Sequence, residues 1–396
     1  MWGIDVSHTA HTGAQTGIQH VCRDLLKCFV SDNLAEPVIF DPYLREWRNP
    51  DARENSFLFP DSSFRPPSKR SGKWSRMQKL RGRLNYRLGK VQRPKCYDLL
   101  FCPELFDFRR DSSIFSPSWP GRPLRVAYFY DAIPVKFPEW TPEKTVSRYP
   151  DYLRALARFD HVACISRASE RDLHDAWKDL KIGRIPPTSA IPLGLPFNRA
   201  SDLSRDDHSY QEGTPVVLMV GTLEARKNHL AVLQACEDLW RSGLEFQLRL
   251  IGMLNKETGT DAAIKIDQLA QQGYPVEWEG AVSNDRLSTV YSKADIFLYP
   301  SLYEGFGLPV LEALAHGLPT ITTIKGALSE LVEGGGCLPC GDNSAGIAES
   351  LRILLTDKEQ CQKLSGEARK RPIRSMRDAC NDLGSLFQEL ASRPKS

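Results

Sequence analysis

The stretch Glu304-Gly-Phe-Gly-Leu-Pro-Val-Leu-Glu312 decides the fold class of this chain, because its glycine-rich turn follows an apolar segment and opens into a helix. Residues 296–299 before it are apolar, as expected of a strand buried on both faces of a parallel sheet. Pro309 suits the first helical position, where a missing amide proton costs nothing. The amides near Gly307 and Leu308 would then point out of the helix N-terminus and favour a bound diphosphate.

The two carboxylates of this stretch are expected in different places. Glu312 would lie in the first turn of the helix, and Glu304 would precede the turn, near the phosphates and the group they carry. A glycoside hydrolase needs two carboxylates on opposite sides of one sugar at a defined separation. We do not expect this pair to serve as such an acid and base, although a loop charge and a helix-capping charge would also explain it.

A second phosphate-binding candidate lies at residues 217–228, where an apolar segment leads to Gly221 and then to Arg226 and Lys227. Arginine can bind phosphate oxygens in a bidentate manner, and lysine supplies a compact charge. Taken alone, such a stretch is more often a solvated helix start.

Short apolar segments, each long enough for a strand, alternate along the whole chain with segments long enough for a helix. This alternation predicts an α/β fold with parallel sheets. The predicted strands are 2–4, 38–40, 99–102, 125–130, 161–165, 216–220, 247–251, 276–279, 296–299 and 319–322. The 396 residues exceed what one core normally supports. We therefore expect a domain over 1–200, completed by a helix at 378–396, and a second over 201–377, with the polar segment 201–214 as linker.

These motifs together resemble the family-4 retaining glycosyltransferases, whose GT-B architecture has two facing Rossmann-like domains. The resemblance rests on Glu304 and Glu312 around Gly-Phe-Gly-Leu-Pro and on the segment Gly221-Thr-x-x-x-Arg226-Lys227-Asn228, and it is densest over 216–331. It implies transfer of a hexose from a nucleoside diphosphate sugar, with retention at the anomeric carbon. Arg226 and Lys227 would neutralise the departing diphosphate.

The resemblance also assigns the remaining donor contacts. Glu304 would lie near the transferred sugar, while the amides of Phe306 and Gly307 would bind its hydroxyl groups. The backbone at Val282 would meet the base, and Glu312 would accept hydrogen bonds from the ribose.

The N-terminal half would hold the acceptor, but it departs from the family pattern. Its loop over 13–20 would bring backbone near Gly17 towards the donor phosphate, yet Gln19 and His20 stand where the pattern has Gly and Arg. Asp131 follows Tyr130, where His is usual; Asp131 is either an acceptor-orienting group or a structural cap of the next turn. Ser166 matches a family serine and is also suited to N-cap a helix.

The implied reaction is a mannosyl transfer from GDP-mannose to a glycan or lipid-linked glycan in surface polysaccharide synthesis. UDP-glucose or UDP-galactose as donor, a sugar-nucleotide epimerase and a non-catalytic sugar-nucleotide-binding protein remain alternatives. We expect no cofactor and no metal, since the chain has no Asp-x-Asp motif and its closest cysteine pair, Cys337 and Cys340, has no second pair to complete a zinc site.

Composition sets further limits on partners and location. A net charge of +3 does not favour nucleic acid, and the scattered cysteines indicate reduced core residues. With no apolar run of membrane-spanning length and no signal-peptide pattern, we expect a cytoplasmic protein, at most peripheral on the inner face of the membrane.

Residues 65–95 contain twelve Lys or Arg and no Asp or Glu. Within them, apolar residues recur near helical spacing: Trp74, Met77, Leu84, Leu88 and Val91. This amphipathic basic segment would either lie on an anionic membrane or pack its apolar stripe on the domain. RNA binding is less favoured, because few aromatic residues interrupt the basic ones.

Overall fold

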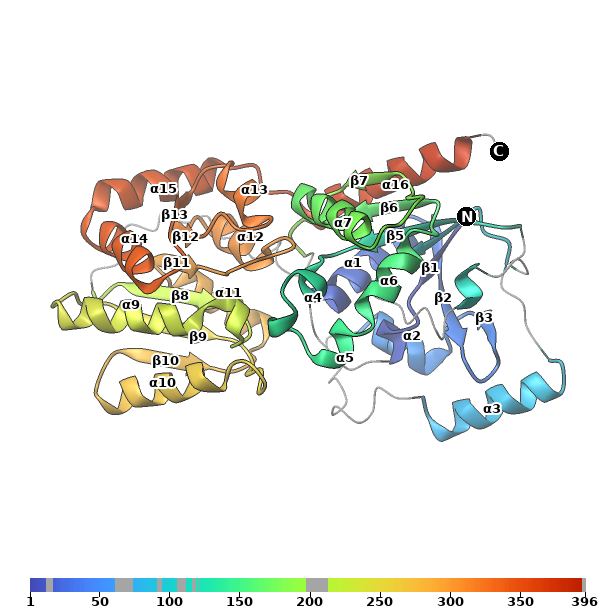
Figure 1. Cartoon of the computed structure of the whole chain (residues 1–396), viewed down its shortest axis with the longest axis horizontal. Helices are drawn as coiled ribbons and strands as arrows, with labels where there is room; N and C mark the ends of the chain where they lie inside the picture. The colour runs from blue at the N-terminus through green and yellow to red at the C-terminus, as the bar shows by residue number, and fades with distance from the viewer. Residues whose placement is uncertain are drawn as a thin grey trace. The chain divides into compact units, whose positions relative to one another are not determined.

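The computed structural model describes residues 1–11, 17–60, 74–90, 95–104, 112–115, 119, 121–196 and 213–393. The chain forms two compact units (Figure 1). Unit 1 comprises Met1–Tyr130, Ser147–Pro192 and Met376–Ser396, and unit 2 comprises Asp131–Val146 and Leu193–Ser375. The boundary predicted at residue 200 falls within 197–212, outside the described residues.

Unit 1 is built on a seven-stranded sheet in the order β3-β2-β1-β4-β5-β6-β7, in which only the β2–β3 pair is antiparallel. Its strands are β1 (Trp2–Asp5), β2 (Ala35–Asp41), β3 (Glu46–Arg48), β4 (Leu99–Cys102), β5 (Leu124–Phe129), β6 (His161–Cys164) and β7 (Thr188–Ala190). Its helices are η1 (Thr9–His11), α1 (Gly17–Ser31), α2 (Ala52–Leu58), α3 (Arg76–Arg87), η2 (Ser112–Phe115), α6 (Tyr149–Leu156), α7 (Arg167–Asp179) and α16 (Met376–Ser392).

Unit 2 has a six-stranded parallel sheet in the order β10-β9-β8-β11-β12-β13. Its strands are β8 (Val216–Val220), β9 (Gln247–Ile251), β10 (Val276–Glu279), β11 (Ile296–Tyr299), β12 (Thr320–Thr322) and β13 (Cys337–Pro339). Its helices are α4 (Ile133–Lys136), η3 (Pro138–Trp140), α5 (Glu143–Val146), η4 (Ala225–Lys227), α9 (His229–Arg241), α10 (Thr260–Gln271), α11 (Asn284–Ser292), α12 (Leu308–Ala315), α13 (Leu328–Val332), α14 (Ser344–Thr356) and α15 (Lys358–Lys370).

The continuous apolar sequences of β8 and β11 arise because helices cover both faces of this sheet (Figure 1). Val217 and Met219 of β8 belong to one core cluster with α9 and α14, while Leu218 and Val220 belong to another with α11 and α12. Strand alternation thus fills two hydrophobic layers from one five-residue run.

The predicted α/β class and Rossmann-like sheets are confirmed, and the ten predicted strands are present with ends that differ by at most a few residues. Three strands were not predicted: β3, β7 and β13. Each has three residues and forms an edge of its sheet. An edge strand needs no long buried apolar run, so these segments carry little hydrophobic signal.

Residues 131–146 group with unit 2, although they lie within the range 1–200 expected for the first domain. Two side chains of this segment contact Tyr303 of the same unit. The Lys136 Nζ donates to the Tyr303 hydroxyl at 2.8 Å, and the Phe137 ring lies 5.0 Å from the Tyr303 ring.

Of the helices in the described part of the chain, none combines the length and apolarity needed to cross a bilayer.

Candidate functional site

The carboxyl ends of β8 and β11 form the topological switch point of unit 2. From β8 the chain proceeds outward to β9 and β10, whereas β11, β12 and β13 follow on its other side. Open parallel sheets bind ligands at this point, because loops from adjacent strands diverge there. Gly221 follows β8 and Ser301 follows β11, so the two predicted phosphate-binding motifs meet at this edge.

A buried ion cluster joins the two motifs. The Arg226 Nη1 lies 2.6 Å from the Glu304 Oε2, and the Lys227 Nζ lies 2.5 Å from the Glu304 Oε1. The second guanidinium nitrogen of Arg226 pairs with Glu224 at 2.6 Å. Both cations lie in or beside the short turn η4 that precedes α9, and not within the helix itself.

Two hydroxyl groups complete the cluster around Glu304. The Ser301 Oγ donates to the Glu304 Oε1 at 2.6 Å, and the Tyr299 hydroxyl donates to the same oxygen at 2.9 Å. Lys227 also donates to the Tyr299 hydroxyl. Within the described residues, these contacts use two of the three Lys227 N–H groups, which leaves the third for a ligand oxygen.

Electrostatics keep Glu304 ionised. Burial alone would raise the pKa of its carboxyl group, but the charges of Arg226 and Lys227 outweigh burial and lower this pKa to about 2. Burial, and then the neighbouring Arg226 charge, lower the pKa of Lys227, while Glu304 opposes that shift. The Glu304 carboxylate is consequently a very weak base at neutral pH and orients the two cations.

The turn before α12 has the geometry that the glycines predict, with two corrections. Gly307 is the N-cap of α12 at φ 104°, and a Cβ there would lie 2.8 Å from a methyl group of Leu328. Because α12 begins at Leu308, Pro309 is its second residue and Glu312 its fifth. The predictions that Pro309 is the first residue of the helix and that Glu312 lies in its first turn were therefore both wrong by one residue.

Glu312 is held by the neighbouring helix. The hydroxyl group of buried Tyr291 donates to the Glu312 Oε2 at 2.9 Å, and the His316 ring stacks on the Tyr291 ring. The Glu312 carboxylate therefore has a fixed orientation one turn into α12.

The loop after β12 supports the backbone at Glu304. The Ala327 amide donates to the Glu304 carbonyl at 3.0 Å, and Gly326 adopts φ 59° beside it. A Cβ on Gly326 would lie 2.4 Å from that carbonyl oxygen, so only glycine allows this approach.

The other predicted donor residues lie around the same sheet edge. Phe306 is half-buried in the turn before α12, and Leu308 is the first residue of that helix. Val282 is half-buried just before α11, in the loop that follows β10. The Tyr299, Ser301 and Gly326 contributions were missed, since hydroxyl groups and a single glycine carry no motif of their own.

The predicted N-terminal residues have local structural partners. The Asp131 Oδ1 accepts a hydrogen bond from the Ile133 amide at 3.0 Å, although the N-cap residue of α4 is Ala132, without a side-chain cap bond. Gly17 is the first residue of α1, and residues 12–16 before it lie outside the described part of the chain. Ser166 N-caps α7 and accepts from the Ser169 amide.

The switch point of unit 1 carries two buried carboxyl groups that the sequence did not single out. Asp5 ends β1, and Glu104 lies two residues after β4. Glu104 accepts hydrogen bonds from the amides of His8 and Thr9 and from the Thr9 hydroxyl. An acidic residue just beyond an apolar strand was the available signal for Glu104.

Burial and the nearby Asp5 raise the pKa of Glu104 to about 8, against the effect of these hydrogen bonds. We expect the free energy of unfolding to fall as pH rises from 4.5 to about 8, because the folded protein retains a proton that the unfolded chain releases. The change is on the order of a few kcal/mol, and Glu104→Gln is expected to remove it. Denaturant unfolding at several pH values measures this slope.

The exposed Glu389→Gln is the matched control and should keep the wild-type slope. An unchanged slope in Glu104→Gln would contradict the assignment of the proton to Glu104.

Among the residues that the structure describes, no three His, Cys, Asp or Glu side chains are arranged to hold a metal ion. Cys337 is buried and Cys340 half-buried, both as free thiols.

Sequence comparison finds a family match in the second half of the chain. Residues 201–371, which contain the ion cluster and the turn before α12, match the family described as glycosyl transferases group 1. The matched region covers less than half of the chain and lies in unit 2.

The chain also has curated relatives that it covers only in part. It is 26% identical over 248 residues to the serotype-specific mannosyltransferase WbdA of Escherichia coli, which is 58% of this chain and 30% of WbdA. It is 24% identical over 253 residues to the GDP-mannose-dependent alpha-(1-6)-phosphatidylinositol dimannoside mannosyltransferase of Mycobacterium tuberculosis, which is 62% of each. Both matches span less than two thirds of the relative.

The chain as a whole resembles solved GT-B structures. Sucrose-phosphate synthase from Thermosynechococcus elongatus superposes with a TM-score of 0.66 at 18% identity, covering 98% of both chains. At this identity the likeness shows the fold, and the GT-B prediction is confirmed.

Proposed function

We propose that this protein is a retaining glycosyltransferase that moves a hexose from a nucleoside diphosphate sugar to a glycan or lipid-linked glycan. The observation that carries the proposal is the Arg226–Glu304–Lys227 cluster at the switch point of unit 2. Buried Lys227 and half-buried Arg226, oriented by one carboxylate beside the N-terminus of α12, form a preorganised site for a diphosphate.

In the proposed reaction, the bond between the anomeric carbon and the donor phosphate oxygen breaks. The acceptor hydroxyl oxygen forms a bond to the same carbon, on the face of the sugar from which the phosphate departs. The nucleoside diphosphate leaves. Glu304, with its pKa near 2, is too weak a base to take the acceptor proton. That proton would pass to the departing phosphate oxygen, while Arg226 and Lys227 stabilise the developing negative charge.

We further propose GDP-mannose as donor and a surface polysaccharide as product. The support is that the relatives above are named as mannosyltransferases, one of them GDP-mannose-dependent. In this arrangement Glu312, oriented by Tyr291, would accept hydrogen bonds from the ribose, and the backbone at Val282 would contact the base. We place the reaction in the cytoplasm, at the inner face of the membrane where lipid-linked acceptors lie.

A donor screen tests the proposal. The screen compares GDP-mannose, UDP-glucose and UDP-galactose. We expect one of them, GDP-mannose, to raise the unfolding temperature of the purified protein. Glu312→Ala should weaken this binding about tenfold or more, since loss of a hydrogen bond to a charged group costs about 1.5–3 kcal/mol. Glu277→Ala, an exposed carboxylate on β10, is the control.

Transfer to an acceptor would then be followed by NMR, which reports the anomeric configuration of the product. An inverted product would rule out retention. Donor binding without hydrolysis or transfer to any glycan would instead indicate a sugar-nucleotide-binding protein, and conversion of the donor without an acceptor would indicate an epimerase.

A further inference from the structure

Helix α3 exposes an apolar stripe to solvent. Met77, Leu80, Leu84 and Leu88 are 80%, 68%, 52% and 57% exposed. Steps of three and four residues place them on one face of the helix. Met77 and Leu80 are the two most exposed large apolar side chains of the described residues. Of the stripe predicted from sequence, Trp74 packs on the unit, where it stacks on His11 at 3.9 Å, and Val91 lies outside the described residues.

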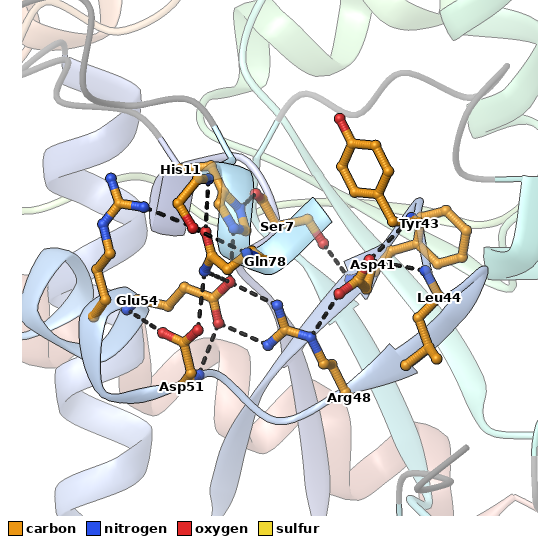
Figure 2. Close-up of polar contacts among 12 residues, drawn as sticks. Ser7, His11, Asp41, Tyr43, Leu44, Arg48, Asp51, Glu54 and Gln78 are labelled. Atoms are coloured by element: carbon orange, nitrogen blue, oxygen red, sulfur yellow. Dashed lines mark hydrogen bonds and ion pairs between the residues drawn. The ribbon is translucent and has the colours of Figure 1, made fainter. Parts of the chain in front are cut away.

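The opposite face of α3 is fixed to unit 1. Gly82, the one buried residue of the helix, packs on Tyr43, since a Cβ there would lie 2.8 Å from the Tyr43 Cβ. The Gln78 side-chain amide donates to Asp51 at 2.9 Å and to Glu54 at 3.0 Å (Figure 2).

This anchor is part of a larger ionic network (Figure 2). Arg48 forms a bidentate pair with buried Glu54, with both distances 2.7 Å, and bonds to Asp41 at 3.0 Å. His11 lies 2.7 Å from the same Glu54 carboxylate. Burial opposes ionisation of Glu54, but Arg48 lowers its pKa to about 2. Because α2, β3 and η1 all join this network, α3 cannot rotate its apolar stripe inward without breaking it.

The charge of α3 and its flanks is entirely positive. Residues 74–90 contain six Lys or Arg and no Asp or Glu. Lys79 and Arg83 lie over the Tyr43 ring on the anchored side. Arg76, Arg81 and Arg87 are exposed, and helical spacing places them on the flanks of the apolar stripe.

We propose that the exposed face of α3 is a docking surface for an anionic lipid bilayer. An interfacial helix buries an apolar stripe at the headgroup boundary, while flanking cations bind anionic headgroups. The lipid surface is favoured over a second copy of the chain, because six cations without an acid would repel the same face of another molecule. The surface belongs to unit 1 and requires no donor, so the inference is independent of the proposed transfer reaction.

Vesicle sedimentation with the full chain tests this inference. We expect the wild type to bind vesicles of phosphatidylcholine with phosphatidylglycerol and to bind pure phosphatidylcholine vesicles weakly. The triple variant Met77→Gln, Leu80→Gln, Leu84→Gln and the triple variant Arg76→Gln, Arg81→Gln, Arg87→Gln should each lose about tenfold or more of the vesicle affinity. Added salt should weaken wild-type binding.

The controls are Leu230→Gln and Ile264→Gln, which replace half-exposed apolar residues of unit 2. Since the replaced side chains on α3 are exposed, the variants should melt at the wild-type temperature. Leu84→Trp offers a separate readout, a blue shift of tryptophan fluorescence on anionic vesicles. Three outcomes would each overturn the proposal. The first is equal vesicle binding by the wild type and the apolar triple variant, and the second is wild-type binding to neutral vesicles as strong as to anionic ones. The third is a wild-type dimer that does not bind vesicles and that is lost in the apolar triple variant.

Discussion

Replacement of Lys227 by alanine is expected to lower the transfer rate by about 10²–10³ and to abolish stabilisation by the donor. Lys227 is the buried one of the two cations paired with Glu304, and in the proposed reaction it faces the charge that develops on the leaving diphosphate. Loss of one preorganised group that stabilises such a charge typically has this magnitude. Steady-state kinetics and thermal unfolding with and without the sugar nucleotide measure the two effects.

Arg226→Ala is expected to lower the transfer rate as well. The increase in activation free energy of the double variant should be smaller than the sum of the two single increases, because both cations share Glu304. Removing both cations also leaves a buried carboxylate unpaired, which destabilises unit 2 by about 3–5 kcal/mol. Lys293→Ala, an exposed lysine of unit 2, is the control. If Lys227→Ala kept wild-type kinetics and donor stabilisation, the cluster would have a structural role only.

The largest stability effect is expected at Phe387 in α16. Its ring is fully buried and lies 5.1 Å from the Trp2 ring, 5.7 Å from that of Phe29 and 4.9 Å from that of Phe101. This C-terminal helix therefore supplies part of the core beneath the first strands of unit 1. Phe387→Ala should lower the free energy of unfolding by about 3–5 kcal/mol, as measured by denaturant titration.

The exposed Glu389→Ala on the same helix should change stability by less than about 0.5 kcal/mol. Deletion from Met376 onward should destabilise unit 1 more than Phe387→Ala does, since it removes the whole helix. Unchanged unfolding of both forms would mean that the aromatic cluster contributes nothing to folding.

The central strands could be predicted because they have a local cause. Val216–Val220 and Ile296–Tyr299 are buried on both faces, so each reads as an uninterrupted apolar run. The turn at Gly307 could likewise be predicted from the glycine and from Pro309 after it. The edge strands β3, β7 and β13 could not, because half-exposed strands of three residues need no such run.

What lies beyond local sequence is the pairing of side chains far apart in the chain. Lys227 and Glu304 are 77 residues apart, and their ion pair, their hydroxyl partner Tyr299 and the pKa of Glu304 follow from the adjacency of β8 and β11. The raised pKa of Glu104 likewise depends on tertiary structure, because it follows from burial of this side chain near Asp5, which lies on β1.

By itself, the sequence determined the α/β class, the central strands, the family motifs and the amphipathic pattern of α3, since each is encoded in the spacing of neighbouring residues. Only the tertiary structure decided which charges are buried together and which apolar face of α3 remains exposed. The physical reason is that burial, and with it the local dielectric environment and the pKa values, depends on elements brought together from distant parts of the chain.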